Sequence, residues 1–257
     1  MGRIRLSAFF SNFAAGFQEK FDLLIHSLEL NFFSNGRYML YLDGLKTTIL
    51  LSLAAIALGV VLGLLATYLR RSTALLNSRF ALLRGLGKIL HAIGYIYVDV
   101  IRATPTMVQL MIITYVVFAT SSVSKFFIAF IAFSLNSGAY ISEIFRAGLD
   151  SIDKGQNEAG RSLGLSATQT MLYIILPQAV RNVLPALANE FIMLIKETAI
   201  VGLIALDDLT RAGEIVRSVT YAPYTPLIIS AIMYYVVVKV LTLCLGAFER
   251  WLKKSEH

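Results

Sequence analysis

Polar and charged side chains inside long apolar stretches are the residues of this sequence whose types and spacing suit chemistry. Asn136, Tyr140 and Glu143 recur at positions i, i+4 and i+7, so they lie on one face of a helix. A charge inside a bilayer costs roughly 2.5–3.5 kcal/mol on insertion scales, and each such residue therefore needs a partner or a function. We expect this face to point into a helix bundle, where it would line a water-filled path.

Two interpretations are open for the remaining polar residues of these stretches. Asp99 and Arg102 are three residues apart and can pair along one helix face, which we interpret as a structural ion pair. The other residues either line a central path or form interhelical pairs that hold the bundle and its gate. The path candidates are Arg102, Gln109, Asn136, Tyr140, Glu143, Asn189, Lys196 and Glu197.

The composition indicates which elements position these residues. The chain has 57% hydrophobic and 15% charged residues, whereas soluble domains have about 45–50% and about 25%. Its apolar runs are about 20 residues long, which is the length that a helix needs to cross a bilayer. The single Cys244 excludes an internal disulfide, and the three histidines lack metal-ligand spacing. We therefore expect the chain to contact lipid. We expect no metal site in it.

The expected fold class is an all-α membrane protein with five transmembrane helices and a helical loop on one side. The spans are expected at about residues 47–68, 94–118, 125–145, 183–206 and 227–248. In the first span, Gly59 and Gly63 follow Ala55 at intervals of four residues, which lets another helix approach closely in lipid. This membrane domain covers residues 45–250, between an N-terminal segment, 1–44, and a tail, 251–257.

Two prolines modify the expected spans. Pro105 breaks the second span and frees the carbonyl near Ile101, for which Thr104 or Arg102 is the expected partner. Pro185 is expected in the first turn of the fourth span, where a proline costs little.

The distribution of Lys and Arg predicts the orientation, because short cytoplasmic loops carry an excess of both. Five lie between the first two spans, four in the polar stretch 146–182 and three after the fifth span, in residues 249–257, all on one side of a five-span chain. The opposite side carries three between spans and five before the first span, in residues 1–46. The C-terminus is therefore expected in the cytoplasm and the N-terminus outside. The net charge of +7 then reflects basic cytoplasmic loops rather than nucleic-acid binding.

The N-terminal segment has a mixed composition and carries no cleavable signal peptide by its pattern. Residues 21–30 have apolar side chains at helical spacing, interrupted by Asp22, His26 and Glu29. A helix that lies on the membrane surface and a partly disordered tail both fit this pattern.

The polar stretch 150–177, DSIDKGQNEAGRSLGLSATQTMLYIILP, is predicted to form two short helices. Asp153 with Gln156 makes a capping box for the first helix, and Gly164 stands where a helix needs a left-handed stop. Ser166 with Gln169 makes a second capping box, for a helix that runs to Leu176. Pro177 is expected to end or kink the chain after it. Such a hairpin suits a groove on a cytoplasmic partner.

This stretch resembles the EAA loop of ABC importer permeases, whose pattern is E-A-A, three residues, G, nine residues and I-x-L-P. We therefore name residues 150–177 the EAA-like loop. Gly160 replaces the second alanine of the pattern, and both residues are small enough for close packing. The residues that match the pattern, and that the resemblance implicates in ATPase coupling, are Glu158, Ala159, Gly160, Gly164, Ile174, Leu176 and Pro177.

Three further segments resemble polar amino acid permeases of the histidine, glutamine and arginine group. Residues 102–110 are similar to R-G-T-P…V-Q-L, with Ala103 in place of glycine, and residues 134–143 are similar to S-L-N-x-x-A-Y-x-x-E. Residues 189–196 also fit, so the resemblance covers roughly residues 45–250.

The resemblance implies a type I ABC importer in a bacterial inner membrane. Two permease subunits, identical or paralogous, pair there, each docks its EAA loop into a cytoplasmic ATPase subunit, and an external binding protein delivers the substrate. The ATPase binds ATP and Mg²⁺, so neither a cofactor nor an enzymatic activity is expected in this chain. The sequence agrees, because it contains no G-x-x-x-x-G-K-[ST] phosphate loop.

The implied cargo is a polar amino acid or a close derivative. A zwitterionic amino acid needs acceptors for its ammonium group and donors for its carboxylate. Glu143, Glu190 or Glu197 can supply the first, which favours a cationic or neutral cargo. Arg102, Gln109 or Lys196 can supply the second. The sequence does not choose among the individual amino acids.

Two other function classes fit less well. A stand-alone channel or secondary transporter is the main alternative, but the five spans show no evident inverted repeat and the helical loop would have no role. A membrane-embedded enzyme would need a base at a matched depth, and His26 and His91 lie outside or at the edge of the expected spans.

Overall fold

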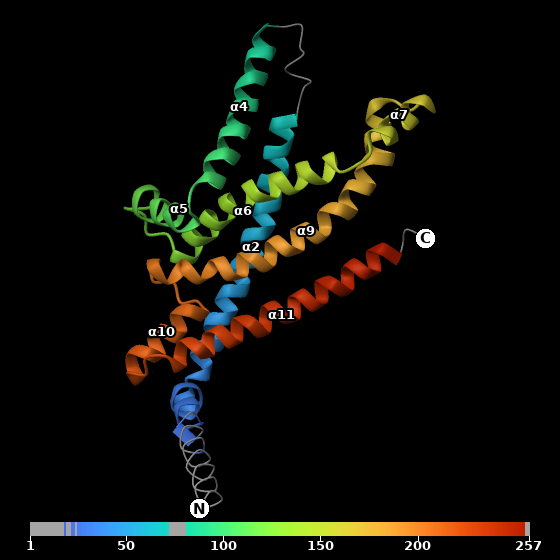
Figure 1. The fold of residues 1–257 in the computed structure, drawn as a ribbon. Coiled ribbons are helices and arrows are strands. Elements are labelled where there is room, and N and C mark those ends of the chain that lie inside the picture. The colour runs from blue at the N-terminus through green and yellow to red at the C-terminus, as the bar shows by residue number, and fades with distance from the viewer. Residues whose placement is uncertain (1–17, 19–21, 24, 72–80, 255–257) are drawn as a thin grey trace, which may run out of the picture.

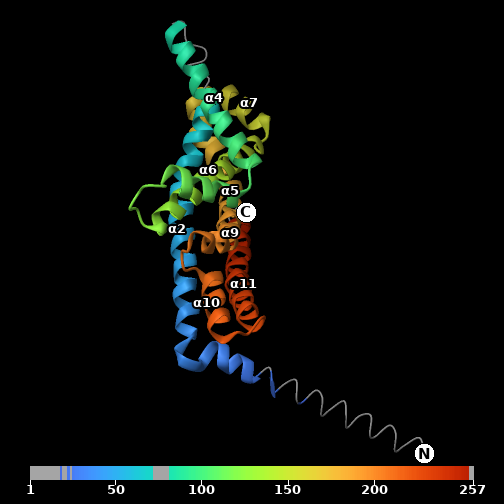
Figure 2. The same ribbon diagram turned by 90° about the vertical axis from the view of Figure 1, so that its left-hand side faces the viewer.

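The computed structural model describes residues 18, 22, 23, 25–71 and 81–254, and every regular element in this part of the chain is a helix. Figures 1 and 2 show that α2 runs through much of the length of the molecule. α6 and α9 pack against α2, and α11 packs on α9 and α10. α7 of the EAA-like loop lies toward one end of α2, and the segment that precedes α2 lies at the other end. The expected all-α fold class is confirmed.

The bounds of the helices differ from the edges of the apolar runs, because hydropathy marks where a helix contacts lipid and not where it is capped. The α-helices are α2 (Tyr38–Arg71), α4 (Ala81–Ala103), α5 (Thr106–Ile112), α6 (Lys125–Asp150), α7 (Lys154–Ser162), α8 (Ala167–Thr170), α9 (Leu176–Glu197), α10 (Leu209–Thr220) and α11 (Thr225–Lys254). Short π- and 3₁₀-helical segments join them, namely η1 (Glu29–Phe33), η2 (Ser34–Gly36), η3 (Ile113–Val117), η4 (Met171–Ile175) and η5 (Thr198–Ile204).

Among the described residues, three helices are long and apolar enough to cross a membrane, namely Tyr38–Arg71, Lys125–Asp150 and Thr225–Trp251. The bent pair Leu82–Ala103 and Thr106–Val117 adds a fourth if it is taken as one span. The sequence predicted five spans. The fourth of these, 183–206, falls in α9 and η5, which do not meet the same test of length and composition. α9 is a continuous helix of 22 residues, but it carries four charged residues.

Glycines hold α2 and α6 in close contact. A Cβ atom added at Gly63 would lie 2.6 Å from Cγ2 of Ile141, and one added at Gly59 would lie 3.2 Å from Cβ of Ser137. Larger residues at these positions would therefore separate the helices. The expected close approach of a second helix at Gly59 and Gly63 is confirmed, and that helix is α6.

The break at Pro105 bends the chain by 112° between α4 and α5. Proline cannot donate the backbone hydrogen bond that would continue α4, so the new helix starts with Pro105 as its extended N-cap residue. The predicted break is confirmed, but α4 begins at Ala81, well before residue 94. Arg84 and Lys88, which were expected in a loop, consequently lie on the exposed surface of α4.

The predictions for the other two prolines were wrong. Pro177 does not end a helix, because it stands in the first turn of α9, where its missing N–H is tolerated. Pro185 lies inside α9 rather than in its first turn, because α9 begins at Leu176 and not near residue 183. The helical path from α8 through η4 into α9 is therefore unbroken in sequence.

The segment before α2 is tied to the loop between α10 and α11. Asn31 is fully buried, its Nδ2 donates to the carbonyl of Ser27 at 2.7 Å, and its Oδ1 accepts from the hydroxyl of Thr220 at 2.7 Å. Asn35 and Gly36, with φ of 55° and 69°, then turn the chain into α2. The described part of residues 1–44 is thus a helical segment packed on its own chain. Residues 1–17, 19–21 and 24 lie outside the described residues.

Asp208 fixes the start of α10. Its side chain is fully buried and accepts hydrogen bonds from the backbone N–H groups of Thr210 and Arg211 at 3.1 and 2.9 Å and from the hydroxyl of Tyr234 at 3.0 Å. Burial raises the pKa of the Asp208 carboxyl, while these donors oppose that shift. The side chain thereby joins α10 to α11.

Gly63→Val is expected to lower the thermal unfolding midpoint of the purified protein, because the branched side chain would force α2 away from Ile141. Overpacking of this kind costs about 1–3 kcal/mol. Gly85→Val is the matched control, since an added Cβ at this helical glycine meets nothing within 4 Å. Both substitutions change helix propensity equally. Equal shifts of the two unfolding midpoints would contradict the close packing of α2 and α6.

Candidate functional site

The first helix of the EAA-like loop is fixed by its N-cap. Oδ1 of Asp153 accepts from the backbone N–H of Gly155 at 2.6 Å, so the predicted cap of α7 is confirmed. The predicted capping box with Gln156 is wrong, because the side chain of Asp153 accepts from the N–H of Gly155 and not from that of Gln156. Gln156 does not return a bond to Asp153, because its Oε1 accepts instead from Nε2 of Gln178 in α9 at 3.4 Å.

The turn between the two helices is confirmed as predicted. Gly164 has φ of 86°, a conformation that glycine adopts without strain. The N–H of Leu165 donates to the carbonyl of Gly160, and the N–H of Gly164 donates to the carbonyl of Arg161, both at 3.1 Å. This pair of bonds is the Schellman stop of a helix. The two bonds fix the direction in which the chain leaves α7.

The second capping box is also confirmed. The backbone N–H of Gln169 donates to Oγ of Ser166 at 3.2 Å, and Oε1 of Gln169 accepts from the backbone N–H of Ser166 at 2.8 Å. These bonds start α8, which continues into η4 and α9. Both ends of the hairpin are therefore held by hydrogen bonds within the loop.

Gly160 is the residue at which the two helices of the hairpin touch. It is buried, and a Cβ added there would lie 2.7 Å from Cγ2 of Thr170 and 2.9 Å from Cδ1 of Ile174. The expected close packing at Gly160 is confirmed. An alanine, which the EAA pattern prefers at this position, would require Thr170 to move.

The outer surface of the hairpin combines polar and apolar side chains. Glu158 and Ala159 are exposed, as are Leu163 at the turn and Tyr173 in η4. Leu163 and Tyr173, with 80% and 71% of their surfaces exposed, were not singled out from the sequence. Large apolar residues in an otherwise polar loop were the signal that could have identified them.

A cluster of charged side chains joins three helices between the EAA-like loop and the bundle. Oε1 of Glu143 lies 2.5 Å from Nη1 of Arg70, and Oε2 of Glu143 lies 2.7 Å from Nη2 of Arg146. Arg102, from α4, lies 3.7 Å from the same Oε2 atom. One carboxylate of α6 is thus surrounded by three guanidinium groups, and only 17% of the Glu143 side chain is exposed.

The guanidinium group of Arg102 has a second neighbour, the ring of Tyr140, at 5.6 Å from the ring centroid. The expected ion pair between Asp99 and Arg102 is not among the ion pairs of the described residues. The prediction was wrong because Arg102 lies next to Glu143 of another helix, whereas Asp99 is exposed. Two arginines around Glu143 come from other helices, Arg70 and Arg102. The side chain of Arg102 is 44% exposed, against 17% for Arg70, and it lies farther from the carboxylate.

The side chain of Gln109 makes the hydrogen bonds that the break at Pro105 requires. Its Nε2 donates to the carbonyl of Ile101 at 2.7 Å and to the carbonyl of Thr104 at 3.0 Å. It therefore satisfies the backbone freed by Pro105, for which Thr104 or Arg102 was expected. Its Oε1 accepts from Nδ2 of Asn136 at 2.9 Å, and both side chains are buried. Gln109 and Asn136 thus hold the bend at Pro105.

The polar residues of α9 are not gathered around Glu143. Glu190 accepts a hydrogen bond from the hydroxyl of Ser137 in α6 at 3.1 Å. Asn189 and Lys196 are exposed, and Glu197 is half-buried. Within the described residues, these last three form no side-chain hydrogen bond and no ion pair. The structure thus brings Arg102, Tyr140 and Glu143 together, and leaves the candidates of α9 apart from them.

The described part of the chain contains no group of three or more His, Cys, Asp or Glu side chains that could hold a metal ion. The polar atoms of the site are instead suited to bind charged organic groups. Guanidinium groups donate hydrogen bonds in pairs to carboxylates, and carboxylates accept from ammonium groups.

Comparison with known proteins gives consistent matches. A model of the family described as binding-protein-dependent transport system inner membrane component matches residues 74–254. The arginine transport system permease protein ArtQ of Bacillus subtilis is 37% identical over 217 residues, which cover 84% of this chain and 93% of that protein. The glutamine transport system permease protein GlnP of Escherichia coli K12 is 35% identical over 217 residues, covering 83% and 93%.

Solved structures agree with the sequence matches. A crystal structure of an amino acid ABC transporter with histidines has a TM-score of 0.76 and 39% sequence identity, covering 85% of this chain and 97% of that chain. An inward-facing structure of the MetNI methionine ABC transporter has a TM-score of 0.66 and 20% identity, covering 85% and 99%. The second match concerns the fold alone.

Glu143→Gln is expected to destabilise the protein, because it removes the carboxylate shared by Arg70, Arg102 and Arg146. Hydrogen bonds to charged groups contribute about 1.5–3 kcal/mol, so the thermal unfolding midpoint should fall measurably. Asp99→Asn is the control, since it removes one exposed carboxylate outside the cluster. An unfolding midpoint that falls as far for Asp99→Asn as for Glu143→Gln would contradict the assigned role of the cluster.

Proposed function

Because this chain belongs to the family of binding-protein-dependent transport system inner membrane components, we propose that it is the membrane permease of an ATP-driven amino acid importer. The observation that carries the proposal is the EAA-like loop, a hairpin capped at both ends and joined directly to α9. A loop that only linked two spans would need no such construction. The alternative of a stand-alone channel or secondary transporter gives the hairpin no task.

The hairpin transmits motion from a cytoplasmic ATPase to the bundle. Its exposed side chains Leu163 and Tyr173 fill a groove on the ATPase, and Glu158 is also exposed on the hairpin. Since α8, η4 and α9 follow one another without a break, a displacement of the hairpin moves α9 with it. ATP and Mg²⁺ are bound by the ATPase, and hydrolysis takes place there.

The orientation follows from this assignment. The EAA-like loop and the C-terminus lie on the cytoplasmic side of a bacterial inner membrane, and the N-terminus lies outside. The cluster around Glu143 is then near the inner end of the path. A second permease subunit, identical or paralogous, completes the path, and an external binding protein delivers the cargo to it.

Arg102 is the residue of this chain proposed to receive the carboxylate of the cargo. It is more exposed than Arg70, and its distance of 3.7 Å from Glu143 leaves its N–H groups available. Tyr140 holds the guanidinium group from one face. Gln109 and Asn136, whose amides are used by the bend at Pro105, support the path without contacting the cargo.

The ammonium group of the cargo is assigned to the carboxylates of α9. Glu190 and Glu197 lie seven residues apart and so share one helix face, and Asn189 and Lys196 share another. Two relatives of similar identity are named for arginine and for glutamine transport. A cationic or neutral polar amino acid is therefore the proposed cargo, with Glu190 or Glu197 as acceptor.

Tyr173→Asp is expected to abolish most of the copurification of the ATPase with the tagged permease, because a charge replaces an apolar side chain that fills the ATPase groove. Tyr224→Asp is the matched control at the opposite end of the molecule, with 73% of its surface exposed against 71% for Tyr173. Pull-down from membranes measures both. Retention of the ATPase by Tyr173→Asp, or equal loss in both variants, would sink the docking assignment.

Arg102→Gln is expected to lower cargo uptake by about tenfold, which corresponds to roughly 1.4 kcal/mol of lost carboxylate binding. The readout is uptake of labelled arginine and glutamine into proteoliposomes that contain the permease, the ATPase and the binding protein. Arg84→Gln, on the same helix but far from Glu143, should leave uptake unchanged. Copurification of the ATPase should survive in both variants. Uptake at the normal rate by Arg102→Gln would refute the role of Arg102.

A further inference from the structure

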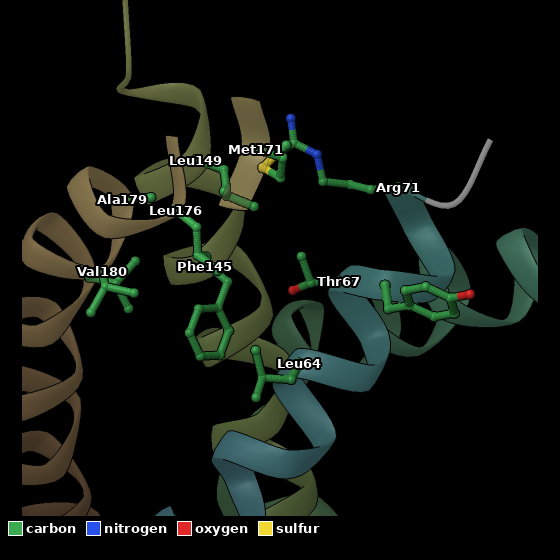
Figure 3. A pocket seen from close by; sticks show the side chains of 11 residues that line it. Leu64, Thr67, Arg71, Phe145, Leu149, Met171, Leu176, Ala179 and Val180 are labelled. Atoms are coloured by element: carbon green, nitrogen blue, oxygen red, sulfur yellow. The ribbon is translucent and has the colours of Figure 1, made fainter. Parts of the chain in front are cut away.

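An apolar groove of about 570 Å³ lies between α2, α6 and the start of α9 (Figure 3). Leu64 of α2, Phe145 of α6 and Val180 of α9 line three of its sides. Figure 3 shows these side chains pointing into one space, with Arg71 at its upper edge. These apolar side chains leave a groove between them that suits a hydrocarbon chain.

A second pocket, of about 490 Å³, continues the groove toward the EAA-like loop. The two pockets share Arg71, Leu149 and Met171. The second pocket has a polar lining with charges of both signs: Arg71 and Lys154 are cationic, and Asp150, Asp153 and Glu158 are anionic. The combined cavity is therefore apolar in one half and zwitterionic in the other.

The boundary between the two halves coincides with the end of the apolar helix α2. Arg71 is the last residue of α2, and Thr67 and Leu64 lie about one and two turns before it. Basic side chains at the end of a spanning helix lie at the level of the lipid headgroups. The groove is therefore at the depth of acyl chains, and the polar pocket is at the depth of headgroups.

From this arrangement we infer that the two pockets together bind one phospholipid with a zwitterionic ammonium headgroup, such as phosphatidylethanolamine. An acyl chain occupies the groove along Leu64, Phe145 and Val180. Arg71 and Lys154 donate to the phosphate, and Asp153 and Glu158 accept from the ammonium group.

The charges of the polar pocket select this lipid class. Three carboxylates face two cationic groups, so a lipid with a net negative charge is disfavoured. A choline headgroup carries the same charges but has no N–H donor for the carboxylates. Arg71 already donates to Asp150 at 2.8 Å, but a guanidinium group has five N–H donors, and Asp150 is also held by Arg146 at 3.1 Å. Arg71 therefore keeps donors for a phosphate.

The lipid would join the bundle to the hairpin. Met171 and Leu176, which precede and begin α9, line the groove together with Leu64 and Phe145 of the bundle. An acyl chain in the groove fills this space. Without it, the hairpin could shift with less movement of α2 and α6. This consequence rests on the proposed function, whereas the binding of the lipid does not.

Native mass spectrometry of the purified importer, delipidated and then exchanged into nanodiscs of phosphatidylethanolamine, phosphatidylcholine or phosphatidylglycerol, tests the inference. We expect the released permease to retain phosphatidylethanolamine at least tenfold more than either other lipid. Equal retention of the three lipids, or preference for phosphatidylglycerol, would overturn the assignment of the headgroup.

Two variants locate the site. Val180→Trp fills the groove and should reduce retained phosphatidylethanolamine to the level of phosphatidylcholine. Val236→Trp is the control on α11, since Val236 is 50% exposed against 43% for Val180 and lines neither pocket. Lys154→Gln changes only the polar pocket and should reduce the preference for the ammonium headgroup without unfolding the protein. Unchanged retention by both Val180→Trp and Lys154→Gln would overturn the site.

A second copy of this chain is the competing occupant of the groove. A disulfide between two copies of the Val180→Cys variant in the purified importer would assign the groove to that second copy and overturn the lipid site. Failure of the proposed function is separate, because a wild-type protein that retains phosphatidylethanolamine but takes up no amino acid would contradict only the transport assignment.

Discussion

The structure depends on one carboxylate, Glu143, which is shared by three arginines from α2, α4 and α6. Charges near a bilayer are tolerated only when they are paired, so three guanidinium groups and one carboxylate cannot be separated without cost. This requirement holds the ends of three helices together just below the EAA-like loop. It also leaves Arg102 as the arginine at the longest distance from Glu143, which is why Arg102 is the residue proposed to receive the cargo carboxylate.

The close packing of α2 and α6 makes this cluster feasible. Gly59 and Gly63 bring the backbones near enough for Arg70 to reach Glu143. Thr67 strengthens the contact, since its hydroxyl lies 3.2 Å from the carbonyl oxygen of Ser142. In lipid the hydrophobic effect does not favour contact between helices. Helices associate there through the close packing of small residues and through hydrogen bonds between polar groups.

The hairpin and α9 form a second unit beside this one. The bonds at Gly164 and Ser166 fix the hairpin internally, and Pro177 begins α9 without interrupting the helical path. α9 packs directly on α6 and α2, and the groove lies between the three helices near the start of α9. Under the proposed function, the occupant of that groove would affect how much of the movement of the hairpin reaches the rest of the bundle.

The sequence by itself determined the features that depend on neighbours along the chain. The helical periods, the caps at Asp153 and Ser166, the left-handed Gly164 and the break at Pro105 all follow from local spacing, and each is present. The sequence placed the span edges less well, because α4 and α9 begin in polar stretches that hydropathy assigns to loops. Hydropathy also placed the fourth expected span, 183–206, in α9, although α9 carries four charged residues.

Only the tertiary structure decided which polar groups meet. Arg102 pairs with Glu143 and not with Asp99, which is nearer in the sequence. Arg70 pairs with Glu143 although the two residues are 73 positions apart. Gln109 satisfies the bend because α4 and α5 fold back at 112°. The physical reason is that a buried polar group takes whichever partner the packing brings within hydrogen-bond distance, and helix packing is set by contacts between residues far apart in sequence.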